Sequence, residues 1–506
     1  MNDDDRQRIN RNNHILAEKW QPARVFQFFA DIAAIPRGSG NVTAVADYLE
    51  AFAQKKRLEY ARDAVGNVII RKKGRPCKCA GVILQAHQDM VCVKTAEKDH
   101  NFATDPVEFL DKNDGWLRAS ETTLGADDGI GVALALALLD DDSLELPPLE
   151  GLFTVDEETD MKGAKAVQAA SLKGDTLINL DAEDLHIAYV SSAAGVAFQV
   201  RLPLQAASGT PGTIMRQVAV NDLLGGHSGI EIHKARANAY VLLARFLNEA
   251  AKTIEFSLHT FSQAEGHGAD NAIPDRAVAQ LSFASERDAE SLAHLAETWT
   301  QQLQNEYRSS DPDVNLTVSA LVGTPDGPAI DAASRRTLLD MICLFPLGVW
   351  RFIQSGSLLD TRYGALLVES SCNLGIVRAG NDQAVLSFLA RGSTASVLTD
   401  LMSRAEALAR MAGATLTVSN RTSGWEMPEH PSPIQQLFEG QGVTLLGIHA
   451  GLECGCLVEA FAKDGRKLDA VSVGPDLKDV HSPNERLHIE SVSVLWKQLL
   501  TVLSKL

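Results

Sequence analysis

The stretch Gly151-Leu-Phe-Thr-Val-Asp-Glu-Glu-Thr-Asp160 is the point from which the rest of the chain can be understood. Its first residues form a short apolar, β-prone run, which predicts a buried strand. Four acids then follow within five positions, and they are Asp156, Glu157, Glu158 and Asp160. Open α/β sheets bind ligands at the carboxyl ends of their strands. We therefore expect this strand to end in a cleft lined by carboxylates.

Three other apolar segments end in polar residues in the same way. They run into His87-Gln-Asp89, Gly125-Ala-Asp127-Asp128-Gly129 and Asn179-Leu-Asp181, and Asp479-Val-His481-Ser-Pro adds a second histidine near the C-terminus. Histidine and carboxylate side chains are the ligands of hydrolytic zinc sites. Two histidines, three carboxylates and one spare glutamate match two cations that share a bridging carboxylate. This combination predicts the ligand set of a two-metal hydrolase.

Each of these signals also has a plain structural explanation when it is taken alone. His87-x-Asp89 fits a buried histidine with a local hydrogen bond as well as a metal ligand with its acceptor. Asp127-Asp128 fits the start of the apolar helix that follows, so one acid can cap that helix while the other bridges two cations. An isolated pair such as Glu157-Glu158 fits a solvated loop. On an extended segment, however, the two glutamates point in opposite directions, so that one can ligate a metal while the other takes a proton from water.

The composition limits the classes of protein to which the chain can belong. With 506 residues, of which 45% are hydrophobic, it can bury a large core and is too long for one compact domain. The formal net charge of −18 argues against nucleic-acid and anionic-membrane partners, because both favour clustered Lys and Arg. The charged N-terminus has no apolar signal segment, and the longest apolar run, 130–139, is about half of a membrane span. We expect a soluble, cytoplasmic protein.

The seven cysteines do not predict a metal site or a disulfide framework. An odd number of cysteines and the absence of a secretory signal favour reduced thiols. Cys77-Lys-Cys79 and Cys454-Gly-Cys456 have Cys-x-Cys spacing. Structural zinc sites of the ribbon type use a wider spacing within each pair.

The order of predicted elements indicates two domains of the α/β class. Helices are expected over 23–34, 41–56, 130–139, 233–251, 288–306, 332–343 and 395–411. Strands are expected at 68–71, 81–85, 151–155 and 176–180, and their alternation with helices predicts a largely parallel sheet. From about residue 195 the strands alternate in the β manner and are separated by long helices. We therefore expect a catalytic domain formed by 1–194 and 401–506, interrupted by an inserted α/β domain, 195–400, that can consist of two similar halves.

In order and spacing, the strand-end motifs resemble those of the M20 clan of di-zinc exopeptidases and acylases. Four further motifs are similar to those of one subgroup, the aminoacyl-histidine dipeptidases, which are also called Xaa-His or cytosolic non-specific dipeptidases. These motifs are Gly225-Gly-His227-Ser-Gly-x-Glu-Ile-His-Lys, Asn271-Ala-Ile-Pro, Ser371-Cys-Asn-Leu-Gly and Gly451-Leu-Glu-Cys-Gly. The resemblance extends over nearly the whole chain. It implies a phosphorylase/hydrolase-like catalytic domain with an inserted lid domain.

The resemblance also implies a metal-ligand set, position by position. His87 and Asp181 would hold one zinc ion, Glu158 and His481 would hold the other, and Asp127 would bridge the two ions.

Roles beside the metal ions follow from the same resemblance. Asp89 would orient the first histidine ligand, and Glu157 would be the general base on the bridging water. His227, from the lid, would donate a hydrogen bond to the tetrahedral oxyanion. The peptide bond between Asp127 and Asp128 would be cis.

Two further positions are assigned to the substrate, and two depart from the pattern of the clan. Asn271 would help to bind the substrate. Arg391, at the end of a predicted lid strand, is our candidate for binding the α-carboxylate, although an exposed lid arginine is the plainer interpretation. The clan often has Lys where Gly129 stands, and Asp160 follows the glutamate pair closely enough to compete for a cation. Neither departure removes a ligand.

The activity that the resemblance implies is metal-dependent hydrolysis of unbranched dipeptides, with Xaa-His among the substrates. Two divalent ions are expected, with zinc, manganese or cobalt as candidates because mixed His/carboxylate sites accept several metals. A homodimer is expected from the family. Two alternatives stay open: an N-acyl-amino-acid amidohydrolase or tripeptidase of the same clan, and a metal-stabilised scaffold protein without turnover. The intact Glu157 argues against the scaffold, since a non-catalytic site has no use for a spare base.

Overall fold

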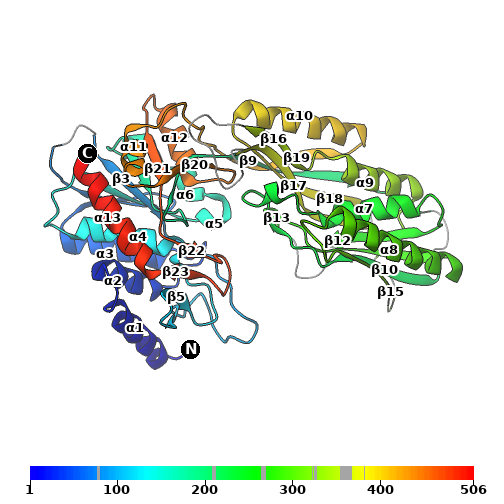
Figure 1. Ribbon diagram of the computed structural model, residues 1–506, viewed down its shortest axis with the longest axis horizontal. Helices are drawn as coiled ribbons and strands as arrows, with labels where there is room; N and C mark the ends of the chain where they lie inside the picture. Colours follow the sequence, from blue (N-terminus) through cyan, green and yellow to red (C-terminus); the bar gives the residue numbers. More distant parts are fainter. Residues whose placement is uncertain are drawn as a thin grey trace.

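The computed structural model describes residues 1–76, 80–207, 212–263, 269–321, 323, 327–353, 367–380 and 382–506. Within these ranges the chain forms two lobes, each with its own large β-sheet (Figure 1). Both chain ends lie in the first lobe, and the middle of the chain forms the second. The Cys77-Lys-Cys79 motif lies outside the described residues. Among the helices in the described ranges, none is long and apolar enough to cross a membrane.

The first lobe is built on an eight-stranded sheet. From edge to edge its strands are β1 (Glu59–Arg62), β2 (Val68–Lys72), β6 (Leu149–Thr154), β3 (Val82–His87), β7 (Thr176–Asn179), β21 (Asp469–Ser472), β8 (Ile187–Ser192) and β20 (Thr444–Ile448). β3 runs parallel to both of its neighbours, β6 and β7. Every residue of these three strands is buried, as their near-continuous apolar sequences predict.

The sheet is mixed rather than largely parallel. β1 and β2 form a hairpin through the turn at Asp63–Asn67, and a short turn of this kind can only join antiparallel strands. β2 then pairs antiparallel with β6, so the expected parallel pairing begins at β6 rather than at β2.

The described part of the first lobe also contains helices. They are α1 (Asp3–Ala17), α2 (Ala23–Ala33), α3 (Thr43–Lys56), α4 (Ala126–Asp140), α5 (Glu157–Asp160), α6 (Lys162–Ala166), a 3₁₀ turn (Ala169–Ser171), α11 (Pro433–Glu439), α12 (Glu453–Lys463) and α13 (Ile489–Lys505). α4 packs against α2 and β3, and its residues 128–139 are all buried, which confirms the expectation for this apolar helix. A small antiparallel sheet of β22 (Leu477–Lys478), β23 (Arg486–His488), β5 (Trp116–Ala119) and β4 (Phe109–Asp111) lies beside it.

The second lobe has a nine-stranded sheet and its own hydrophobic core. In order its strands are β15 (Asn315–Ala320), β10 (Ile214–Asn221), β14 (Ala277–Phe283), β12 (Ser257–Gln263), β17 (Leu367–Gly380), β18 (Gln383–Gly392), β9 (Ala194–Pro203) and β19 (Thr415–Thr422), with β16 (Gly348–Ile353) paired to β17. A separate two-stranded ribbon joins β11 (Gly226–His227) to β13 (Ala272–Ile273).

Four helices complete the second lobe in its described part. They are α7 (Ala239–Ala250), α8 (Glu286–Glu306), α9 (Ala332–Leu344) and α10 (Ala395–Met411), and a 3₁₀ turn spans Ile232–Lys234. The expected helix over 233–251 is wrong at its start, because Asn238 caps α7 by accepting hydrogen bonds from the backbone amides of Tyr240 and Val241.

The α/β class, with a second lobe inserted into the first, is confirmed. β19 ends at Thr422 and belongs to the second sheet. We therefore propose that the chain returns to the first lobe after this strand, about twenty residues beyond the boundary expected at 400.

Candidate metal centre

The five expected ligands meet at one edge of the first sheet. β3 ends at His87, β6 leads into Glu158 and β7 leads into Asp181. Because these strands are parallel, their carboxyl ends lie at the same edge. Asp127 comes from the start of α4, and His481 comes from the turn between β22 and β23.

Asp127 lies between the two histidines. Its Oδ1 is 3.0 Å from Nε2 of His87, and its Oδ2 is 3.1 Å from Nε2 of His481. Burial raises the pKa of the Asp127 carboxyl, but the hydrogen bonds with the two histidines outweigh it and hold the pKa well below its usual range. One carboxylate therefore faces both halves of the site.

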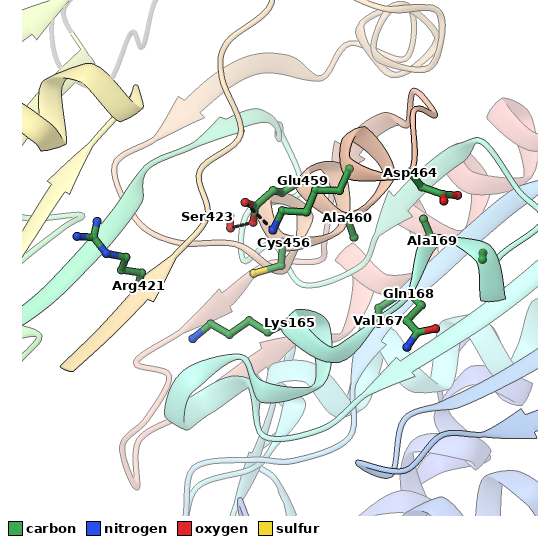
Figure 2. Close-up of a pocket in the computed structure, with 12 residues that line it drawn as sticks. Lys165, Val167, Gln168, Ala169, Arg421, Ser423, Cys456, Glu459, Ala460 and Asp464 are labelled. Atoms are coloured by element: carbon green, nitrogen blue, oxygen red, sulfur yellow. Dashed lines mark hydrogen bonds and ion pairs between the residues drawn. The ribbon is translucent and has the colours of Figure 1, made fainter. Parts of the chain in front are cut away.

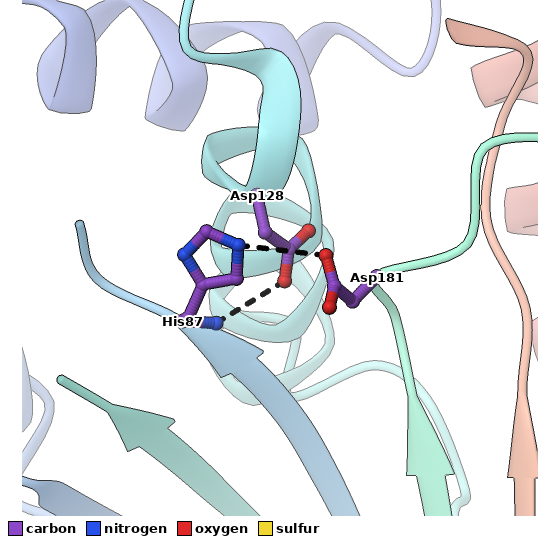
Figure 3. Close-up of side chains that lie close together, drawn as sticks. All are labelled: His87, Asp128 and Asp181. Atoms are coloured by element: carbon purple, nitrogen blue, oxygen red, sulfur yellow. Dashed lines mark hydrogen bonds and ion pairs between the residues drawn. The ribbon is translucent and has the colours of Figure 1, made fainter. Parts of the chain in front are cut away.

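The remaining ligands complete the two halves. Nε2 of His87 is 3.5 Å from Oδ1 of Asp181, and Nε2 of His481 is 3.0 Å from Oε2 of Glu158. Donor atoms lie within 4.8 Å of one another in three groups, which are His87 with Asp128 and Asp181, His87 with Glu157 and Glu158, and Asp127 with Glu158 and His481. Figure 3 shows the first of these groups at the start of α4.

Asp128 was given no definite role from the sequence, and its surroundings are those of a structural acid. Its carboxylate accepts hydrogen bonds from the backbone amides of Gly131, at 3.1 Å, and His87, at 3.2 Å. These contacts hold Asp128 within the first turn of α4, where its own backbone is not helical, while Asp127 projects between the histidines. The peptide bond between them is cis, which confirms the expectation.

Asp89 holds the first half of the site together. Nδ1 of His87 lies 3.1 Å from the backbone carbonyl oxygen of Asp89 and 3.4 Å from its Oδ1, and the carboxylate accepts hydrogen bonds from Ser39 Oγ and from the amides of Glu157 and Glu158. Burial alone would raise the pKa of Asp89, but its hydrogen bonds, that with His87 first, lower it to about 2. A carboxylate in this position orients a histidine ligand through its second ring nitrogen.

The expectation that the glutamate pair lies on an extended segment is wrong. Glu157 and Glu158 begin α5, a single helical turn, because Asp156 adopts a left-handed conformation (φ 54°) and its Oδ1 accepts a hydrogen bond from the amide of Gly40. The two side chains are still in different surroundings. Glu158 contacts His481, whereas burial, together with neighbouring carboxylates, raises the pKa of Glu157 well above its usual range. Asp160 is exposed and belongs to none of the donor groups found among the described residues.

The donor set fits two divalent cations. Oε1 of Glu158 is buried and has no hydrogen-bond partner. Burial also raises the pKa of Asp181 to about 7, although His87 acts in the opposite direction. Several buried carboxylates, one of which has an oxygen without a hydrogen-bond partner, require positive charge nearby. Mixed imidazole and carboxylate donors suit zinc, manganese or cobalt.

His227 reaches the first lobe from the second. It lies on β11, paired with Ala272 of β13, and β13 lies at the end of the second lobe that faces the first (Figure 1). Nδ1 of His227 accepts hydrogen bonds from the amides of Gly229, at 3.2 Å, and Ile230, at 3.0 Å. Burial, with the nearby charges of Arg391 and His481, lowers the pKa of His227 to about 4. The ring is therefore neutral, with its proton on Nε2.

Arg391 is buried, with 7% of its surface exposed, so the plainer expectation of an exposed lid arginine is wrong. It pairs with Ser371 across β17 and β18. A Cβ atom at Gly229 would lie 3.0 Å from both Arg391 Nε and His227 Cε1, which places the guanidinium beside the imidazole. Arg391 Nε has no hydrogen-bond partner, and burial lowers the pKa of the guanidinium only to about 10, so it stays charged. Asn271 is exposed directly before β13, and its carbonyl accepts a hydrogen bond from the amide of Ser228.

Two further buried side chains near the site were not assigned from the sequence. His449 binds Ser371 Oγ through Nε2, at 2.8 Å, and its Nδ1 has no partner. Glu453 accepts hydrogen bonds from Gln85 and Thr154, so it joins α12 to β3 and β6 just before their functional ends. Glu453 stands in the quoted Gly451-Leu-Glu motif, but only the tertiary contacts indicate what it does.

A second hollow lies away from these residues. Its volume is about 580 Å³, and it is lined by α6, α12 and the end of β19 (Figure 2). Lys463 on its wall pairs with Glu459 at 2.9 Å, and Lys165 donates to Asn420. The hollow shares no residue with the ligand cluster, so we place the functional site at the strand ends.

The chain is similar to known proteins over almost its whole length. The chain is 34% identical over 499 residues to the cytosol non-specific dipeptidase of Escherichia coli (strain K12), covering 96% of this chain and 98% of that protein. The crystal structure of aminoacylhistidine dipeptidase from Vibrio alginolyticus matches with a TM-score of 0.77 and 31% identity, over 97% of this chain and 98% of that one. A tripeptidase from Staphylococcus aureus, 14% identical over 96% of this chain and 98% of its own, shares the fold with a TM-score of 0.54.

The second lobe also matches a family model. Residues 218–311 correspond to the M20 peptidase dimerisation domain. The two-lobed α/β scaffold, the cluster of histidines and carboxylates at its strand ends and the similarity to known dipeptidases together identify a peptide hydrolase. The chain belongs to the M20 peptidase family, and the resemblance drawn from its motifs is confirmed.

Proposed function

We propose that this protein is a cytosolic, metal-dependent dipeptidase that cleaves Xaa-His and other unbranched dipeptides. The observation that carries the proposal is the placement of Asp127 between His87 and His481, with Glu157 beside them. That arrangement suits hydrolysis of an amide by water.

The chain supplies both halves of a metal site. His87 and Asp181 would hold one divalent cation, Glu158 and His481 the other, and Asp127 would bridge them. When bound, such cations polarise the scissile carbonyl and bring the pKa of a water to about 7.

Glu157 is the proposed general base. It belongs to the donor group with His87 and Glu158, yet it is the spare carboxylate of the proposed ligand set. Burial and the neighbouring carboxylates raise its pKa, which makes it a stronger proton acceptor. Glu157 takes a proton from the attacking water and passes it to the leaving amine.

His227 and Arg391 recognise the rest of the substrate. With Nδ1 occupied by two backbone amides, His227 can only donate from Nε2, which suits an oxyanion that develops in the transition state. Arg391 is a buried cation whose Nε lacks a partner, which suits the α-carboxylate of the substrate. Asn271 would add a contact to the substrate, and the acidic groups of the cleft suit its free α-amino group. Recognition of both termini favours dipeptides.

Relatives support the substrate class and the assembly. The Escherichia coli relative is a non-specific dipeptidase of the cytosol, and the Vibrio alginolyticus structure is an aminoacylhistidine dipeptidase. The match to the dimerisation domain supports a homodimer formed through the second lobe.

A substrate panel tests the proposal. Metal-stripped protein would be assayed with β-Ala-His, Gly-His, Leu-Gly, a tripeptide and N-acetyl-amino acids, before and after addition of Zn²⁺, Mn²⁺ or Co²⁺. We expect metal-dependent cleavage of the dipeptides. Cleavage confined to acylated substrates or tripeptides would assign the chain to another activity of the clan, and no cleavage with two metals bound would favour a scaffold.

A further inference from the structure

Two buried ionic side chains outside the ligand set bind the loops that carry the ligands. Glu485 and Arg37 each have only 2% of their surface exposed. Glu485 follows His481 by four positions, and Arg37 lies between α2 and α3. Neither touches the ligand atoms directly, so their contacts are those of positioning residues.

Glu485 accepts hydrogen bonds from four backbone amides of one short segment. Its Oε2 accepts hydrogen bonds from Leu124, at 2.8 Å, and Gly125, at 3.0 Å. Its Oε1 accepts from Ala126, at 2.8 Å, and Asp127, at 3.3 Å. Both oxygens are thus occupied by the amides that lead into the bridging aspartate, and an anion is favoured at this helix start.

Arg37 binds the same segment from the other side. Its Nη1 donates to the carbonyls of Gln88, at 2.9 Å, and Asp89, at 2.6 Å, and its Nη2 donates to the carbonyl of Gly125. Gly129 makes room for this guanidinium, because a Cβ atom there would lie 2.5 Å from Nη2 and 3.3 Å from Cζ. The glycine that departs from the clan pattern is therefore one of two, with Gly125, that make room for Arg37.

The loop that these contacts anchor has an unusual backbone. Asp479 and His481 both have positive φ angles, 53° and 60°, which side-chain-bearing residues adopt rarely. His481 is also the more exposed of the two histidines, with 49% of its side chain accessible against 1% for His87. Such a loop needs an anchor, and Glu485 ties it to the segment of Asp127.

We propose that Glu485 and Arg37 form a latch, the Glu485–Arg37 latch, that holds His481, Asp127 and His87 in register for both metal ions. The latch rests on the proposed metal centre. Its removal should act first on the ion shared by Asp127, Glu158 and His481, because Glu485 is the contact that joins this loop to the bridge.

The test measures metal binding, which needs no substrate. Metal-stripped protein would be titrated with Zn²⁺ against a chromogenic chelator, and Co²⁺ would report the geometry of the site through its visible spectrum. Glu485→Gln keeps the size of the side chain but turns an N–H donor toward the backbone amides. Gly129→Ala changes neither Glu485 nor any ligand residue but pushes against the Arg37 guanidinium, so it tests the latch independently if the first variant folds poorly.

Glu150 provides a matched control. It is buried (4% exposed) and accepts hydrogen bonds from the amides of Lys173 and Gly174 and from Arg71, but it lies near the opposite end of β6. We expect Glu150→Gln to lower Tm without changing either zinc affinity.

In Glu485→Gln we expect at least one zinc step to lose about tenfold in affinity and the Co²⁺ spectrum to change, with a smaller loss in Gly129→Ala. Two unchanged zinc steps in both variants would overturn the latch and leave the metal centre standing. Equal losses of zinc affinity in Glu150→Gln would show that the effect comes from general destabilisation of the fold, and would overturn the latch too. Wild-type protein that takes up fewer than two ions would overturn the metal centre itself.

Discussion

Asp127 and His481 lie 354 positions apart in the chain, yet Oδ2 of the aspartate is 3.1 Å from Nε2 of the histidine. Burial alone would lower the pKa of His481, but its hydrogen bonds to Asp127 and Glu158 raise it to about 11. A cation that binds here must therefore displace a proton.

We accordingly expect zinc affinity to fall with pH. Each displaced proton should weaken apparent binding about tenfold per pH unit below the raised pKa. Chelator competition at about pH 6 and about pH 8 measures this slope, together with proton release into a weak buffer. Affinity that is the same at both values would show that His481 does not exchange its proton for the metal.

Glu157→Gln should abolish most turnover while the protein keeps two metal ions. A general base contributes about 10²–10⁴-fold, and the amide cannot accept the proton of water. Steady-state kinetics with Gly-His and metal analysis of the same sample measure both effects. Asp160→Asn, an exposed acid in the same turn, is the control and should retain wild-type rates. Wild-type kcat in Glu157→Gln would exclude it as the base.

His227→Ala should lower kcat by about 10²–10³-fold, with a smaller effect on KM, because its Nε2 proton is proposed to serve the transition state. Metal content should not change, since His227 lies on the second lobe. A rise in KM alone, at constant kcat, would instead assign His227 to ground-state binding of the substrate.

Arg391→Ala should raise KM for free dipeptides by at least about tenfold, because the α-carboxylate loses its charged partner. The same dipeptides with a C-terminal amide should be cleaved poorly by the wild type and no worse by the variant. Arg421→Ala, an exposed arginine at the end of β19, is the control. An equal loss on the amides would show that Arg391 supports the fold rather than the carboxylate.

His449 should make stability depend on pH. Burial, with the nearby charge of Arg391, lowers its pKa from 6.5 to about 3, so the unfolded chain binds a proton that the folded chain excludes. The contribution of neutral His449 to the free energy of unfolding is therefore fully present above the unfolded-state pKa of 6.5, and it is lost as the pH drops from 6.5 toward 3. Between about pH 7.5 and about pH 5.5 this group should cost the wild type about 1.4 kcal/mol.

Denaturant unfolding at these two pH values, for the wild type and His449→Asn, measures this contribution. The variant should lose less stability than the wild type over the interval, and His294→Asn, an exposed histidine on α8, should behave as the wild type. Parallel losses in all three proteins would assign the pH dependence to other groups.

Local patterns in the sequence predicted much of the fold and the candidate ligands. The apolar runs that end at His87, Glu158 and Asp181 became parallel neighbouring strands, because strands buried on both faces need continuous apolar sequence. The buried helix at 130–139 could also be predicted, because its sequence is an almost continuous apolar run. Errors arose where a capping residue set a boundary, as Asn238 does for α7, or where a left-handed residue redirected the chain, as Asp156 does before α5.

The sequence by itself therefore determined which residue types stand at the strand ends, and in what order. Only the tertiary structure decided which of them meet. His481 reaches Asp127, Arg391 is buried beside His227, and Glu485 binds the amides before the bridge through contacts between distant segments. Such contacts depend on how sheets and loops pack, and no local periodicity records them. Hydrophobic patterning specifies elements, whereas long-range hydrogen bonds specify the site.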